Sequence, residues 1–217
     1  MHFFIMWGLR RIRTLMSAGL GALCCTAQAG MFEDARSMDP TPIDIEMAGA
    51  HYRIPRNYLF EMDDWRGGPQ KQVSLRVFYP GFKPLGPDTK DCNHARCRIY
   101  EVVMVDRFTT TEESVSDREI NPQEEKTGPY GFKLYERGPE EARIEYYRKM
   151  VNGQPIMFVC SINKTHQNEA ICHHVARTRS GATIYYFFVR NKELKDAVEV
   201  DLGLRALIDS FYVGEAQ

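Results

Sequence analysis

Apolar and polar residues alternate along several stretches of the chain, as they do in strands with one buried face. In residues 72–80, Val73, Leu75, Val77 and Tyr79 fall on one face, with Ser74 and Arg76 on the other. Within 51–60 a short strand ended by Pro55 is expected, followed by a turn. Strands are also expected at 98–108, 131–137, 141–150, 154–162, 169–177 and 182–190. Because most turns between the later stretches are short, these strands are expected to form an antiparallel meander.

From Lys192 onward the spacing of apolar residues becomes helical. An amphipathic C-terminal helix is therefore expected, with its apolar side packed on the sheet. The predicted fold is α+β, with a single antiparallel sheet of about six to seven strands. The predicted domain spans residues 51–217.

Residues 1–29 read as a secretory signal peptide. Three arginines are followed by a short apolar run from Leu15 to Cys25 and by the small-x-small sequence Ala27-Gln28-Ala29. Residues 30–50 contain two prolines and no clear periodicity, so an N-terminal arm is expected there. The predicted location is the periplasm.

Two details of the leader stay open. Translation starting at Met6 would leave a more usual basic region than a start at Met1. Cys24 and Cys25 stand where a lipid could be attached, but neither has the leucine that usually precedes a lipidated cysteine by three positions. A lipid anchor and an uncleaved leader are the expected routes to any membrane contact.

Charge argues against nucleic acid as a partner. Three of the 28 basic residues lie in the leader, so the mature chain carries 25 basic against 29 acidic residues. No strongly basic stretch remains to neutralise phosphates.

The mature chain retains four cysteines, which favours disulfides in an exported protein. If 154–162 and 169–177 form a hairpin with Cys160 opposite Cys172, the turn centres on His166. In that register Phe158 lies opposite His174, and both faces are mostly apolar. A Cys160–Cys172 bridge is therefore expected. Cys92 and Cys97 would close the second bridge.

Alternatives in which the cysteines bind a metal or react have less support than disulfides. With reduced thiols, Cys160, Cys172 and His174 would share a face and could ligate a metal, and His94 offers a second cluster. An oxidising compartment would remove those thiolates, so no metal or other cofactor is expected. The chain has no G-x-S-x-G elbow, P-loop or HExxH helix, and no carboxylate pair stands out. The protein is therefore not expected to be an enzyme, with an unrecognised hydrolase as the remaining alternative.

Candidate binding residues come from loops rich in Trp, Tyr, Arg and acidic side chains, because aromatic residues and Arg anchor many interfaces. The candidates for partner contacts are Trp65, Arg66, Tyr79, Phe82, Glu112 and Glu113. Each has a plain alternative: the aromatic rings pack on their own domain, and the acidic stretch 112–125 is a solvated loop.

Two stretches resemble known families. The ending "GATIYYFFVRNKEL", continued by "LRALIDSFYV", resembles PsbP-like and DcrB-like envelope proteins, which implies a twisted antiparallel sheet flanked by helices. The stretch "YRIPRNYL", with "WRGG" and "VSLRVFYPGFKPL", is similar to small exported proteobacterial proteins, some resembling immunity proteins against type VI secretion toxins. The four cysteines depart from both patterns, and no catalytic residue is carried over.

The expected function is therefore non-catalytic binding of another protein in the periplasm, as an immunity protein or inhibitor. A small-ligand or metal-handling envelope protein is the alternative.

Overall fold

The computed structural model describes residues 37–60, 62–93, 95–115, 120–163 and 170–216. They belong to a compact unit spanning Ala35–Gln217. The expected leader and the turn around His166 lie outside the described residues. No helix in the described part is long and apolar enough to cross a membrane.

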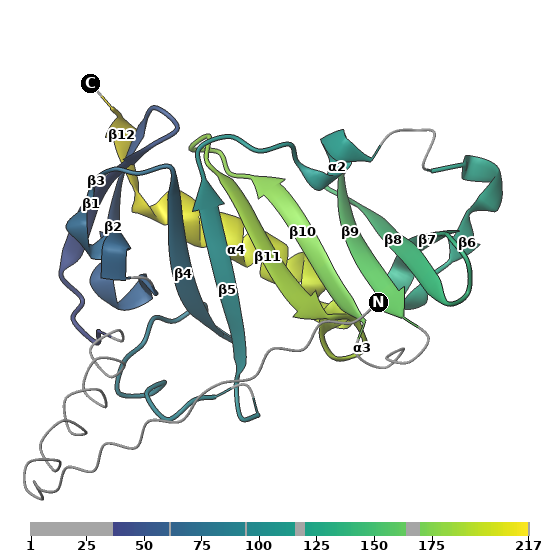
Figure 1. Ribbon diagram of the computed structural model, residues 1–217, viewed down its shortest axis with the longest axis horizontal. Helices are drawn as coiled ribbons and strands as arrows, with labels where there is room; N and C mark the ends of the chain where they lie inside the picture. Colours follow the sequence, from purple (N-terminus) through teal and green to yellow (C-terminus); the bar gives the residue numbers. More distant parts are fainter. Residues whose placement is uncertain (1–36, 61, 94, 116–119, 164–169, 217) are drawn as a thin grey trace, which may run out of the picture. The chain divides into compact units, whose positions relative to one another are not determined.

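The larger sheet is antiparallel and, within the described residues, has eight strands (Figure 1). Their order across the sheet is β4 (Gln72–Tyr79), β5 (Arg98–Val105), β11 (Thr183–Val189), β10 (Ile171–Arg177), β9 (Gln154–Asn163), β8 (Ala142–Val151), β7 (Lys133–Arg137) and β6 (Lys126–Thr127). Six of them run in chain order from β6 to β11; β7 to β11 are the predicted meander, whereas β6 lies in a stretch expected to be a loop.

A second, smaller sheet was not predicted. Within the described residues it has four strands, in the order β12 (Tyr212–Glu215), β2 (Ala50–Pro55), β1 (Pro42–Met47) and β3 (Gly68–Pro69). The prediction of one sheet with six to seven strands is wrong in this respect. The short strand predicted before Pro55 is β2, which pairs with β1 rather than with the meander. Since β1 lies inside the expected arm 30–50, the ordered fold begins before residue 51.

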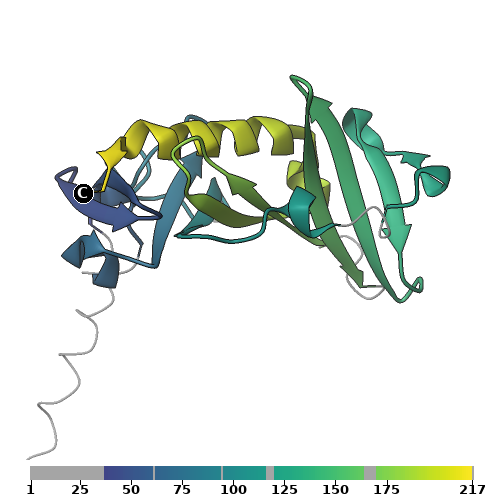
Figure 2. The same ribbon diagram turned by 90° about the horizontal axis from the view of Figure 1, so that it is seen from above.

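The expected C-terminal helix is α4 (Ala197–Phe211), which lies along one face of the larger sheet (Figure 2). It follows the short helix α3 (Arg190–Glu193) and the 3-10 turn η6 (Leu194–Asp196). Val200, Leu204 and Ile208 recur every four residues and are buried in the main core.

Short helices connect the remaining strands: η1 (Arg56–Tyr58), η2 (Met62–Arg66), α2 (Thr111–Ser114), η3 (Pro122–Glu124) and η4 (Pro129–Gly131). Helix α2 and Ile120 lie over part of the other face of the larger sheet. There Ile120 packs with Tyr135, Tyr146 and Met157 in a second, small core. The sheet is therefore covered on one face by α4 and on part of the other by its own polar loop.

Both disulfides are present, Cys160–Cys172 and Cys92–Cys97. Cys160 pairs directly with Cys172 across β9 and β10, in the predicted register. Regular pairing ends at Val159 and His173, however, so the predicted opposition of Phe158 and His174 is not part of the ladder.

Beyond that point the two strands separate, and side chains satisfy the backbone groups. Glu112 accepts a hydrogen bond from the Met157 amide (2.8 Å), and the Thr111 hydroxyl accepts one from the Val175 amide (2.8 Å). The Met157 carbonyl accepts a hydrogen bond from His174 Nδ1 (2.7 Å). Helix α2 thus replaces strand pairing where β9 and β10 diverge.

Candidate functional site

The candidate site is a part of the larger sheet that the described residues leave uncovered. It lies on β5, β10 and β11, on the face opposite α4 and beside the small core. Alternation along each strand decides which side chains point there, because residues two apart share a face. Phe187 and Ile171 are 50% and 48% exposed, and Phe108, just beyond β5, is 60% exposed. We call the surface formed by Val103, Phe108, Ile171, His173, Tyr185 and Phe187 the open face.

Aromatic rings form a continuous group on the open face. The rings of Tyr185 and Phe187 meet edge to face with centroids 4.6 Å apart. His173 lies 6.1 Å from Tyr185 and 6.3 Å from Phe187, again between ring centroids. These distances lie in the range of favourable aromatic pairs, so the rings support one another as a preformed apolar surface.

A groove of about 760 Å³ runs beside these rings. Val103, Val105, Val175 and Tyr185 contribute to its apolar lining, and Phe108 stands at one side. Polar groups are few and include the Thr111 and Ser114 hydroxyls. An apolar groove with a few polar groups suits the binding of an apolar side chain or ligand.

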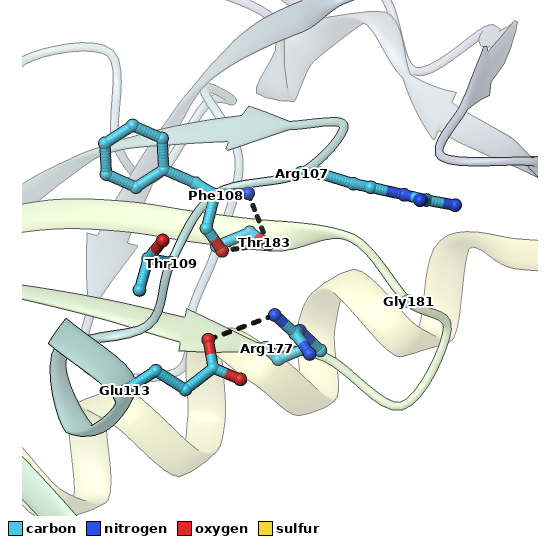
Figure 3. A pocket seen from close by; sticks show the side chains of 7 residues that line it. All are labelled: Arg107, Phe108, Thr109, Glu113, Arg177, Gly181 and Thr183. Carbon is cyan, nitrogen blue, oxygen red and sulfur yellow. Dashed lines mark hydrogen bonds and ion pairs between the residues drawn. The ribbon is translucent and has the colours of Figure 1, made fainter.

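A second hollow, of about 460 Å³, adjoins the groove through Phe108 and Thr109 (Figure 3). Its wall includes an ion pair between Arg177 and Glu113 at 3.2 Å, while the Arg107 side chain extends away from Glu113. The Phe108 amide donates to the Thr183 hydroxyl at 3.4 Å, which ties the connecting segment to β11. The open face therefore ends at a polar rim.

The titratable groups of the open face have environments that keep them neutral. Burial lowers the pKa of His173, and the charge of the adjacent His174 lowers it further. Burial also raises the pKa of Tyr185. At neutral pH both side chains offer uncharged rings, so the surface suits binding by apolar contact rather than proton transfer.

The predicted partner contacts at Trp65 and Arg66 lie on η2, away from the open face. Trp65 is half-buried against the main core, and the guanidinium of Arg56 lies 4.1 Å from the centre of its ring. Arg66 is exposed. Trp65 thus packs on its own domain, which is the alternative to partner binding that the sequence left open.

Tyr79 and Phe82 pack toward α4. The Tyr79 hydroxyl donates a hydrogen bond to the Glu199 carboxylate at 3.0 Å. The rings of Tyr79 and Phe82 meet edge to face, with their centroids 5.7 Å apart. A Cβ atom built on Gly203 would lie 2.0 Å from the Phe82 ring, so this glycine makes room for it. Both rings attach the loop after β4 to the helix.

Glu112 and Glu113 belong to α2. Glu112 accepts from the Met157 amide, and Glu113 forms a capping box with Thr110. The hydrogen bond from the Thr110 amide lowers the pKa of Glu113, and Arg177 lowers it further, although burial opposes them. These carboxylates hold α2 on the sheet, which is a structural task.

The thiol-based metal site considered from the sequence is wrong for this structure, because Cys160 and Cys172 are bonded to each other and His174 faces Asp201. In the part of the chain that the structure describes, no group of three or more His, Cys, Asp or Glu is placed to hold a metal.

Sequence reasoning missed the open face. Tyr185 and Phe187 alternate with Ile184, Tyr186 and Phe188, so both faces of β11 are apolar and the stretch reads simply as a buried strand. The available signal was that α4 can cover only one of the two faces.

No protein-family model matches the chain, and no match was found among curated proteins or solved structures.

Proposed function

We propose that this protein is a non-catalytic binding protein of the cell envelope that holds a partner protein on its open face. One observation carries the proposal: the described residues leave a preformed group of partly exposed rings uncovered on the face of the larger sheet opposite α4. Large exposed apolar patches in folded proteins commonly mark interaction sites. Aromatic residues with a polar rim are the usual anatomy of such a site.

Two features support export. The cysteines form two disulfides, which fits an oxidising environment. The leader-like sequence of residues 1–29 fits secretion to the periplasm. The resemblance stated above implies an immunity protein or inhibitor, so we propose a secreted toxin as the partner.

The test compares two variants, each of which replaces one exposed apolar residue by an acidic residue. Phe187→Asp places a charge on the open face beside His173 and Tyr185. Leu202→Glu places one on the outer side of α4, where Leu202 is 41% exposed. Each tagged variant is used to capture proteins from envelope extracts, and the protein retained by wild type is identified, purified and titrated.

We expect wild type and Leu202→Glu to bind this partner equally and Phe187→Asp to bind it at least about tenfold more weakly, as expected for an aromatic anchor. The thermal midpoints should agree within about 2 °C, because surface substitutions change stability little. Equal binding by Phe187→Asp would refute the proposal.

The groove favours one second candidate, a small apolar ligand. Native mass spectrometry of the protein isolated from the envelope would then show a bound small molecule, and Val103→Asp would release it.

A further inference from the structure

Three arginines surround a hollow of about 490 Å³ between the β10–β11 turn and the outer side of α4. Arg177 ends β10, Arg179 lies in the turn, and Arg205 projects from α4. Asp209 is the only acidic residue that lines this hollow within the described part of the chain. We call it the arginine hollow; Leu202, Ala206 and Ser210 complete its lining.

Asp209 is already engaged as an acceptor. Its two oxygens accept from the Arg179 amide (3.3 Å), the Ser180 amide (3.0 Å) and the Ser180 hydroxyl (2.9 Å). The carboxylate therefore holds the turn in place and leaves little capacity for the guanidinium groups. The lining has three positive charges against one negative charge.

The three arginines differ in the ion pairs that they form with carboxylates. Arg177 contacts Glu113, but both side chains are about half exposed, and such pairs are weak and screened. Arg205 contacts Asp201, which also accepts from His174 and Tyr186. For Arg179, the described part of the chain offers no side-chain hydrogen bond or ion pair.

We propose that the arginine hollow binds a phosphate group. Guanidinium groups donate paired, charge-assisted hydrogen bonds to phosphate oxygens, and several can share one multiply charged tetrahedral anion. The hollow is within the size range of small-molecule sites. The phosphate could belong to a free phosphate ester or to a phospholipid headgroup, because both present the same chemistry. This site is separate from the open face, and the proposal does not rest on the function proposed above.

The experiment titrates the ¹⁵N-labelled mature protein with inorganic phosphate at constant ionic strength and follows the arginine Nε–Hε signals by NMR. We expect saturable shifts at Arg177, Arg179 and Arg205, with half-saturation below about 10 mM. Arg179→Gln should weaken binding at least about fivefold. Arg96→Gln, an exposed arginine in the Cys92–Cys97 loop, is the matched control and should bind as wild type.

A second arm identifies the source of the phosphate. If the site takes a phospholipid headgroup, the protein sediments with phosphatidylglycerol vesicles, and both added phosphate and Arg179→Gln prevent this. If the site takes a free phosphate ester, inorganic phosphate binds and the vesicles do not. Absence of saturable shifts up to about 50 mM phosphate, or equal binding by Arg179→Gln and Arg96→Gln, would overturn the proposal.

Discussion

The Nε2 atom of His174 lies 3.2 Å from Oδ1 of Asp201, and the two side chains are only 1% and 0% exposed. Nδ1 of the same ring donates to the Met157 carbonyl. Both ring nitrogens of this buried histidine therefore face oxygen atoms that can accept a hydrogen bond. Arg205 contacts the other oxygen of Asp201. The interface between α4 and the sheet therefore contains a buried charge network.

Asp201→Asn should destabilise the protein by about 3 kcal/mol, because removing one partner leaves buried charge without its counterion. Urea denaturation at pH 7 measures this change. Asp106→Asn, the same substitution at an exposed position just beyond β5, should stay within about 0.5 kcal/mol of wild type. A comparable small effect for Asp201→Asn would show that the network contributes little.

Acid should lower the stability of the wild-type protein more than that of the Asp201→Asn variant. Burial alone would raise the pKa of Asp201, but His174 and Arg205 outweigh it and hold the pKa below the usual value of 3.8. The stabilisation is therefore complete above the unfolded-state pKa and is lost as pH falls through the lower folded-state value.

Urea midpoints measured from pH 6 down to pH 2 provide the test. Below about pH 4 the wild-type curve should fall more steeply than that of Asp201→Asn, so the two converge. Parallel curves would contradict the assignment of this charge pair.

Removing the Cys160–Cys172 bridge should lower stability by about 2–3 kcal/mol, because the bond restricts the unfolded chain across a separation of 12 residues. The double variant Cys160→Ala/Cys172→Ala tests this by chemical denaturation. Cys92→Ala/Cys97→Ala should lose less, because its loop is shorter and both cysteines are half-buried. A larger loss of stability in Cys92→Ala/Cys97→Ala than in Cys160→Ala/Cys172→Ala would contradict this prediction.

Two adjacent glycines at the start of β3 offer a matched pair of substitutions. Both Gly67 and Gly68 have positive φ, but a Cβ on Gly67 would lie 2.6 Å from the Asp44 carbonyl oxygen, whereas one on Gly68 meets nothing within 4 Å. Gly67→Ala should therefore cost about 1–3 kcal/mol more than Gly68→Ala, since a backbone atom must move. Thermal denaturation of the two variants measures the difference, and equal losses would contradict the close approach to β1.

Much of the larger sheet could be predicted because alternation and short turns are local signals. The register at Cys160 followed from pairing it with Cys172, and two mostly apolar faces were consistent with it. The smaller sheet was missed although Ile43, Ile45 and Met47 alternate with acidic residues, because the nearby prolines suggested an arm. Its pairing of β2 with β12 joins opposite ends of the chain, and no local pattern shows such a contact.

The candidate site was harder to predict for a physical reason. Trp65 and Phe82 were chosen by residue type, but residue type does not show whether a ring points inward. Phe187 lies in the most apolar strand and looked buried, yet the chain has no second helix to cover that face in its described part. Which apolar residues remain exposed to a partner depends on which helices and loops pack over the sheet, and the local sequence pattern does not show this.

Side-chain footprinting of the complex with the captured partner tests the central claim most directly. Hydroxyl radicals label exposed side chains in the free protein and in the complex, and mass spectrometry reads the change at each residue. Phe108, Ile171 and Phe187 should be protected on binding, whereas Met150 and Leu202 should be labelled as before. Protection of Leu202 with unchanged labelling of Phe187 would place the partner on α4 and contradict binding by the open face.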